Sequence, residues 1–112
     1  MNNQVRKAVD AVAQLHTLVA RLAEAPVTDV TRLLQAANDT SDFVEAVNTA
    51  QQAIEAALDE IDGSALKQFD FALDAVRRAR AQFYTPVDEN RANTLTCVEF
   101  AVECLNKGVR AL

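Results

Sequence analysis

The sequence predicts an all-α fold: an up-down antiparallel bundle of four long helices, with a short linking helix between the first two. The 112 residues include only two Gly and two Pro, too few turn formers for a β-rich chain. Half of the residues are hydrophobic, which disfavours disorder, yet no apolar run approaches the ~18 residues of a membrane span. Apolar residues recur at alternating steps of three and four, the helical period. We expect one helical-bundle domain over residues 1–112.

The first long helix is predicted over residues 3–24, and Pro26 ends it because proline disfavours helical geometry in the residue before it. The spacing of its apolar seam is typical of helix packing. The seam consists of Val5, Ala8, Val12, Leu15, Val19 and Leu22.

A short linking helix is predicted next, capped by Thr28 or Asp29 and followed by a loop over residues 38–42. The loop is expected because Asn-Asp-Thr-Ser-Asp consists of capping residues. Asp42 and Glu45 resemble a capping box, so the second long helix is expected to begin there.

The remaining helices are separated by two short links. Gly63 suits the left-handed position that follows a helix, so the second long helix should end just before it. The third is predicted over residues 65–84 and the fourth from about 88 to 112, and the short links make neighbours antiparallel. No internal repeat is evident.

The first and last long helices carry apolar arcs of roughly 200–220°, wider than the ~100–140° that a four-helix core needs. We therefore expect a homodimer that associates through these two helices. Alternatively, the arcs are wide only because alanine, which tolerates water, is counted as apolar.

The residues do not predict an enzyme, a cofactor or a metal site. Cys97 and Cys104 are seven residues apart on one helix, about 10 Å, beyond the ~7 Å Cα limit of a disulfide. They are interpreted as small buried hydrophobes whose apolar surroundings raise the thiol pKa. A single histidine and the absence of a CxxC spacing or a Gly-rich loop leave no metal or phosphate motif.

His16 lies in the stretch Leu15-His16-Thr17-Leu18, which resembles the segment around the phospho-accepting histidine of histidine phosphotransfer domains. The resemblance covers about three residues, and it implies phosphotransfer through His16. That family has Lys three residues after the histidine and then Gly, where this chain has Val19 and Ala20. Because His16 falls near the apolar arc of its helix, we expect a half-buried core histidine instead.

The net charge of −5 is distributed unevenly. Residues 1–38 carry +1, residues 39–74 carry −8 and residues 75–112 carry +2. The helix expected over 42–62 has no Lys or Arg, and Asp59, Glu60 and Asp62 crowd its C-terminus, where the helix dipole favours cations. A local rule broken in this way often marks a functional surface.

Six residues are the candidates for contact with a partner. Five are acids of the middle third, and the sixth is a phenylalanine on the polar face of its helix. They are Glu45, Glu55, Asp59, Asp62, Phe71 and Asp74. In the alternative interpretation the acids form an ordinary solvated face, offset by Lys67 at one end and by Arg77, Arg78 and Arg80 at the other.

These features predict a cytoplasmic, non-catalytic protein-binding module, an inhibitor or regulator that presents an acidic helix face to a basic protein partner. Direct nucleic-acid binding is not expected from an acidic chain whose basic cluster is Arg77-Arg78-Ala79-Arg80, and membrane association is not expected either. The alternative is a structural or assembly subunit that self-associates through the first and last helices. Phosphotransfer through His16 is the third hypothesis.

Overall fold

The computed structural model describes residues 2–24, 30–83 and 88–112, with side chains placed at 2–23, 41–82 and 92–112. All regular structure in these ranges is helical, as the sequence predicts. The four helices are α1 (Asn3–Glu24), α2 (Val30–Leu58), α3 (Gly63–Phe83) and α4 (Asp88–Arg110).

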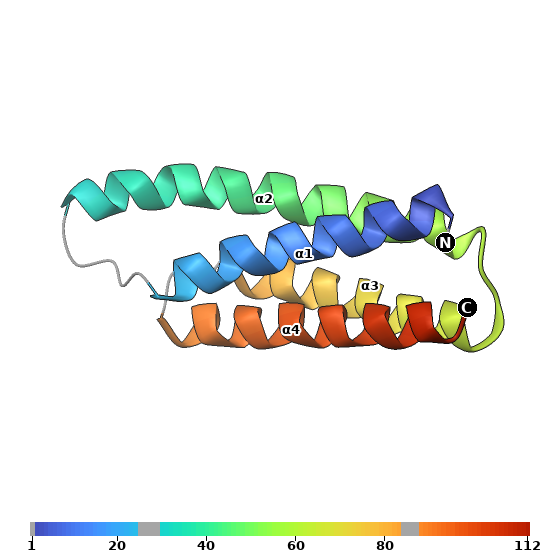
Figure 1. Ribbon diagram of the computed structural model, residues 1–112. Coiled ribbons are helices and arrows are strands. Elements are labelled where there is room, and N and C mark those ends of the chain that lie inside the picture. The colour runs from blue at the N-terminus through green and yellow to red at the C-terminus, as the bar shows by residue number, and fades with distance from the viewer. Residues whose placement is uncertain (1, 25–29, 84–87) are drawn as a thin grey trace.

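The helices pack side by side in an elongated bundle, and consecutive helices run in opposite directions (Figure 1). Each helix packs against the next one along the chain, and α4 returns to pack against α1. The two termini therefore lie at the same end of the bundle (Figure 1).

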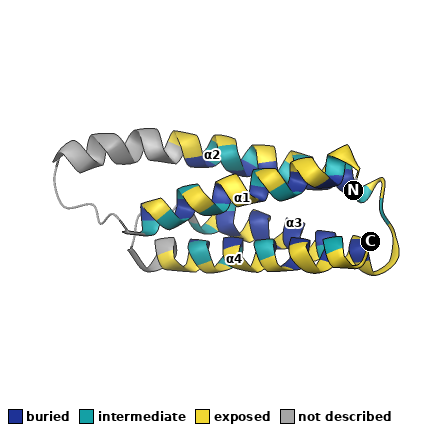
Figure 2. Ribbon diagram, in the orientation of Figure 1, coloured by how far each residue is buried: buried dark blue, intermediate teal, exposed yellow. Residues whose placement is uncertain are grey.

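The core lies on the stripes that face the bundle axis (Figure 2). The predicted seam of α1 is confirmed, since all six of its residues are at most 5% exposed. The same spacing predicts a seam in α3 that consists of Ala65, Phe69, Ala72, Val76, Ala79 and Phe83. The first five of these residues are buried, and the side chain of Phe83 lies outside the described ones. For α4 the spacing predicts two parallel apolar stripes, one of Leu95, Val98, Val102, Leu105, Val109 and Leu112 and one of Cys97, Ala101, Cys104, Gly108 and Ala111. The buried stripe takes residues from both. It consists of Thr94, Val98, Ala101, Cys104, Leu105 and Gly108, whereas Leu112 is 61% exposed.

The predicted short linking helix is wrong. Residues 30–58 form one continuous helix, so the bundle has four helices in its described part and not five. The polar run at 38–42 stays helical because its residues are weak helix formers but not helix breakers, and no Gly or Pro occurs between Pro26 and Gly63. Asp42 and Glu45 consequently lie inside α2 and do not cap a helix start.

The turn between α2 and α3 is longer than predicted and is placed differently, because it occupies residues 59–62 and not 63–64. α2 ends at Leu58, four residues before the expected end at 62. Gly63 does adopt the left-handed conformation, with φ of 61°, but it begins α3 and does not follow α2 directly. The predicted helix end at Ala25-Pro26, the caps Thr28 and Asp29, and the link at residues 85–87 lie outside the described residues.

Gly108 sets the closest approach between α3 and α4. A Cβ atom built on Gly108 would lie 2.6 Å from the Cδ1 and Cε1 atoms of Phe69, whose side chain is fully buried. The missing side chain of Gly108 therefore provides the space that the ring occupies.

Replacing Gly108 by Ala tests this close approach. Gly→Ala inside a helix normally stabilises by up to about 1 kcal/mol. Here the new methyl group must displace a buried ring, so we expect the variant to lose about 1–3 kcal/mol in the free energy of unfolding measured by urea denaturation. An equal or increased free energy of unfolding would show that α3 and α4 do not pack this closely.

Candidate functional site

The interior of the bundle offers no reactive chemistry among the described residues. Thr94 is the one buried polar side chain there, and no buried side-chain nitrogen or oxygen atom lacks a hydrogen-bond partner. No three His, Cys, Asp or Glu side chains in the described ranges gather as metal ligands would. No helix of the described chain is both long and apolar enough to cross a membrane. Candidate function therefore has to be sought on the surface.

Two of the predicted partner-binding residues, Glu45 and Glu55, lie on the outward face of α2, and a third, Asp59, directly follows the last residue of that helix. Glu45, Glu55 and Asp59 are all exposed. At about 100° per residue Glu45 and Glu55 are about 80° apart around α2 and about 15 Å apart along its axis. We call these three residues the acidic stripe.

Glu55 is the member of the acidic stripe that has a cationic partner. Arg77 of α3 donates from Nη2 to Glu55 Oε1 at 3.2 Å. Gln51 Nε2 donates to the same oxygen at 3.3 Å. This exposed pair joins α2 to α3 and shows which levels of the two helices lie side by side.

The other acids of residues 42–62 form no ion pair with a described residue. These are Asp42, Glu45, Asp59, Glu60 and Asp62, all exposed. The expected offset by basic residues is therefore mostly absent. Arg77 meets Glu55 and neither Asp42 nor Glu45, since Glu45 lies ten residues from Glu55, about 15 Å along the helix. Lys67 pairs with none of them.

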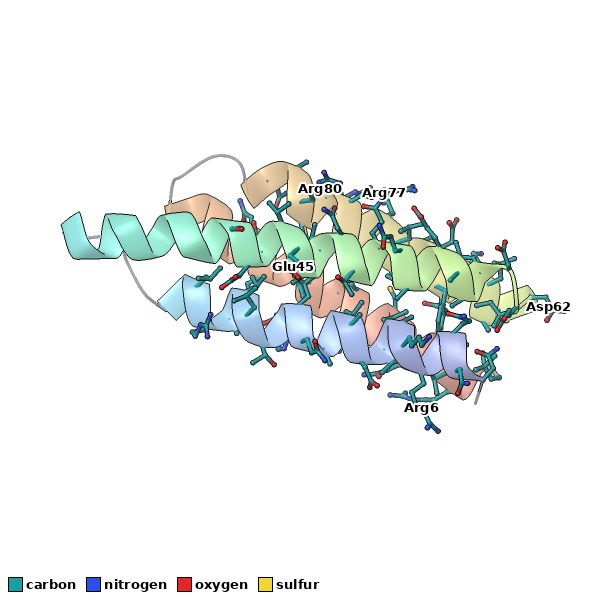
Figure 3. All side chains as sticks on the ribbon, turned by 90° about the horizontal axis from the view of Figure 1, so that it is seen from above. Arg6, Glu45, Asp62, Arg77 and Arg80 are labelled. Carbon is teal, nitrogen blue, oxygen red and sulfur yellow. The ribbon has the colours of Figure 1, made fainter. Side chains whose placement is uncertain are left out.

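The acidity is greatest at the turn between α2 and α3. Figure 3 shows Asp62 at this end of the bundle, with Arg77 and Arg80 farther along α3. Asp70 is exposed and precedes Arg77 by seven residues, two helical turns, so it lies on the same side of α3 but nearer to Asp62. The sequence alone did not indicate Asp70 as a candidate contact residue. The register between α2 and α3, which the Glu55–Arg77 pair shows, places Asp70 beside the acids of the turn.

A shallow groove between α1 and α2 carries two of the unpaired carboxylates. Asp42 and Glu45, three residues apart on α2, lie on one wall. The full lining is Ala11, Gln14, Asp42, Glu45, Ala46 and Thr49. Thr49 donates its hydroxyl to the backbone carbonyl of Glu45 at 2.9 Å. The two carboxylates are the charged groups of the groove lining.

Phe71 and Asp74 are exposed, as expected, but the structure does not bring them together with the acidic stripe. Phe71 is 45% exposed. Asp74 accepts an ion pair from Arg78 on its own helix at 3.0 Å. Glu55 meets α3 at Arg77, whereas Phe71 lies about 120° away around that helix, toward α4. The six predicted residues therefore belong to two surfaces.

His16 lies at the edge between α1 and α4, and its side chain is 38% exposed. Its Nε2 atom is 3.8 Å from Glu99 Oε1 of α4. A phosphorylated histidine would place negative charge beside this carboxylate, which disfavours the phosphoacceptor role.

The wide apolar arc of α1 is explained within the bundle. Val9, Ala11 and Leu18 flank the seam and pack, partly buried, against the core. In α4, Val102 and Val109 do the same. The width of these arcs therefore does not require a second copy, and the homodimer remains a prediction.

The two cysteines are held as thiols. Burial raises the pKa of the Cys97 thiol, and the nearby charge of Arg78 opposes this only in part. Burial likewise raises the pKa of Cys104, where Lys107 lowers it and Glu103 raises it. Cys97 Sγ also lies 3.6 Å from Gln82 Oε1, to which it donates.

These raised pKa values predict slow alkylation. At pH 7.5 both thiols should react with iodoacetamide more slowly than free cysteine, and Cys97, which is partly exposed, should react before the buried Cys104. The folded protein holds the thiol protons more tightly than the unfolded chain. The free energy of unfolding should therefore fall as pH rises past about 8.5. Mass spectrometry of the wild type and of Cys97→Ser assigns the rates, and rapid labelling of both thiols at pH 7.5 would contradict the prediction.

No known protein family, curated protein or solved structure matches the chain. The surfaces described above are therefore the basis for any functional assignment.

Proposed function

We propose that the protein is a non-catalytic binding module that presents the acidic surface of α2 to a basic surface of a protein partner. The acidic surface comprises the acidic stripe, the two acids of the groove between α1 and α2, the acids of the turn between α2 and α3, and the neighbouring Asp70. Its residues are Asp42, Glu45, Glu55, Asp59, Glu60, Asp62 and Asp70. This proposal fits a cytoplasmic inhibitor or regulator.

One observation carries the proposal: residues 42–62 contain six acids and no Lys or Arg, and a single one of these acids has an ion pair with a described residue. Asp74 and Glu103 are paired with cations one turn away on their own helices. Of the acidic surface, Glu55 alone has an ion pair with a described residue. Asp59 and Glu60 also stand at the C-terminal end of α2, where the helix dipole repels negative charge.

A basic partner would relieve this repulsion. A Lys or Arg side chain that entered the groove between α1 and α2 would meet the carboxylates of Asp42 and Glu45 together. Such charge complementarity chiefly accelerates association and selects partners. It also explains why the chain keeps like charges that a purely structural helix would avoid.

Charge reversal at the acidic surface tests the proposal. Glu45→Lys with Asp59→Lys should abolish or strongly reduce capture of the partner from a lysate of the source organism at low salt. These two residues are chosen because neither makes an ion pair with a described residue, whereas Glu55 pairs with Arg77 of α3.

The matched control is Asp10→Lys with Glu99→Lys, which changes the net charge equally on exposed positions of α1 and α4. It should leave capture intact. Asp59→Lys alone should raise the free energy of unfolding, because it puts a cation at the C-terminal end of α2. Equal capture by the wild type and both double variants would overturn the proposal.

A further inference from the structure

Two phenylalanines are exposed on α3 and α4. Phe71 is 45% exposed and Phe100 is 50% exposed, whereas Phe43 and Phe69 are at most 1% exposed. Aromatic rings are the side chains most enriched at the energetic centres of protein interfaces. A pair of half-exposed rings on adjacent helices is therefore a candidate contact surface.

Each phenylalanine begins the same three-residue pattern. On α3, Phe71 is followed by Asp74 after three residues and by Arg78 after four more. On α4, Phe100, Glu103 and Lys107 have the same spacing. We call each set a triad. In both triads the cation pairs with the acid one turn before it, at 3.0 Å in α3 and 3.2 Å in α4.

The triads belong to a longer internal repeat that sequence inspection missed. Residues 69–78, FDFALDAVRR, correspond to residues 98–107, VEFAVECLNK, at an offset of 29. Two of the ten positions are identical, and most of the rest exchange similar residues. Both segments lie on helices that pack against each other along their length.

The antiparallel register brings the two triads together in opposite orientation. Gln82 meets Cys97 near one end of the α3–α4 contact, and Phe69 meets Gly108 near the other. Phe71 therefore lies level with Lys107, and Arg78 lies level with Phe100. The two levels are about 10 Å apart along the helices. Each level thus offers one ring and one cation. At one level the ring is on α3 and the cation on α4, and at the other level the ring is on α4 and the cation on α3.

We propose that this face of α3 and α4 is the interface with a second copy of the chain. In a two-fold dimer whose axis runs across the helices, Phe71 faces Arg78 of the other copy and Phe100 faces Lys107. If the axis runs along the helices, Phe71 faces Lys107 of the other copy and Phe100 faces Arg78. In both cases each ring meets a cation, which is a favourable contact and is made twice by symmetry.

Charge also favours a second copy over a charged partner. The two triads together carry two acids and two bases and are neutral, although the chain as a whole carries −5. The triads themselves therefore add no net charge to a contact between two copies. A standard interface takes about 800 Å² from each partner, roughly an eighth of the 6654 Å² surface, which one side of a four-sided bundle can supply.

This inference is independent of the proposed role of the acidic surface, which lies on α2 and its turn. It also moves the expected homodimer from the faces of α1 and α4 to the face of α3 and α4. Loss of the dimer would leave binding of a basic partner to a monomer unchanged.

Sedimentation equilibrium of the full chain tests the inference. The wild type should show a reversible monomer–dimer equilibrium up to concentrations of about 100 µM, and Phe71→Ser with Phe100→Ser should weaken it at least ~10-fold. Arg78→Gln with Lys107→Gln should weaken it too, because each ring then loses its cation. Leu66→Ser is the matched control, since Leu66 is 37% exposed on α3 but lies on the side toward α2, and it should leave the equilibrium unchanged.

Circular dichroism should show unchanged helix content in these variants of exposed residues. If the double serine variant lost helix content, the double glutamine variant would decide the question alone. A wild type that stays monomeric at these concentrations would overturn the inference. So would a dimer that the double serine or double glutamine variant leaves intact, or one that Leu66→Ser disrupts equally.

Discussion

Close packing of short side chains is the constraint on which the rest of the structure depends. Each helix contributes a fully buried alanine, namely Ala8, Ala50, Ala72 and Ala101. Alanine buries little apolar area, so stability requires that the helices approach closely along their whole length. The contact between Gly108 and the ring of Phe69 is an example of such close packing. Among the described residues this interior is lined almost entirely by apolar side chains, with Thr94 as its buried polar residue.

The acids on the surface lie in two regions that differ in whether cations pair with them. On α3 and α4 the acids of the triads are paired with cations on the same helix, so the triads are neutral, and each carries one exposed ring. On α2 and its turn the acids are mostly unpaired. The first region suits contact with an identical copy, and the second suits attraction of a basic partner.

Much of the fold could be predicted because alternating three- and four-residue spacing maps directly onto one helix face. All six residues that this spacing predicts for the seam of α1 are buried in the structure. The break at 38–42 was wrong because capping residues signal a helix boundary only where the chain actually stops, and nothing here breaks the helix. The buried stripe of α4 also shifted, since two equivalent apolar stripes lay side by side and only packing against α1 and α3 selects between them.

The exposed acids of the candidate site could be predicted from the sequence, but the ion pairs that they form could not. The acids of α2 are exposed as expected, yet which one meets Arg77 depends on the register between two helices, which no local pattern contains. The same register shows that Asp70 belongs with Asp62, and the register between α3 and α4 places Phe71 and Phe100 about 10 Å apart along the two helices. The repeat between 69–78 and 98–107 escaped notice because conservative exchanges outnumber identities.

The most direct test of the acidic surface is the association rate constant with the captured partner as a function of salt concentration. Electrostatic attraction by the unpaired acids predicts a rate that falls steeply as NaCl is raised, while the dissociation rate changes little. An association rate that does not change with salt would contradict the role of these acids in binding.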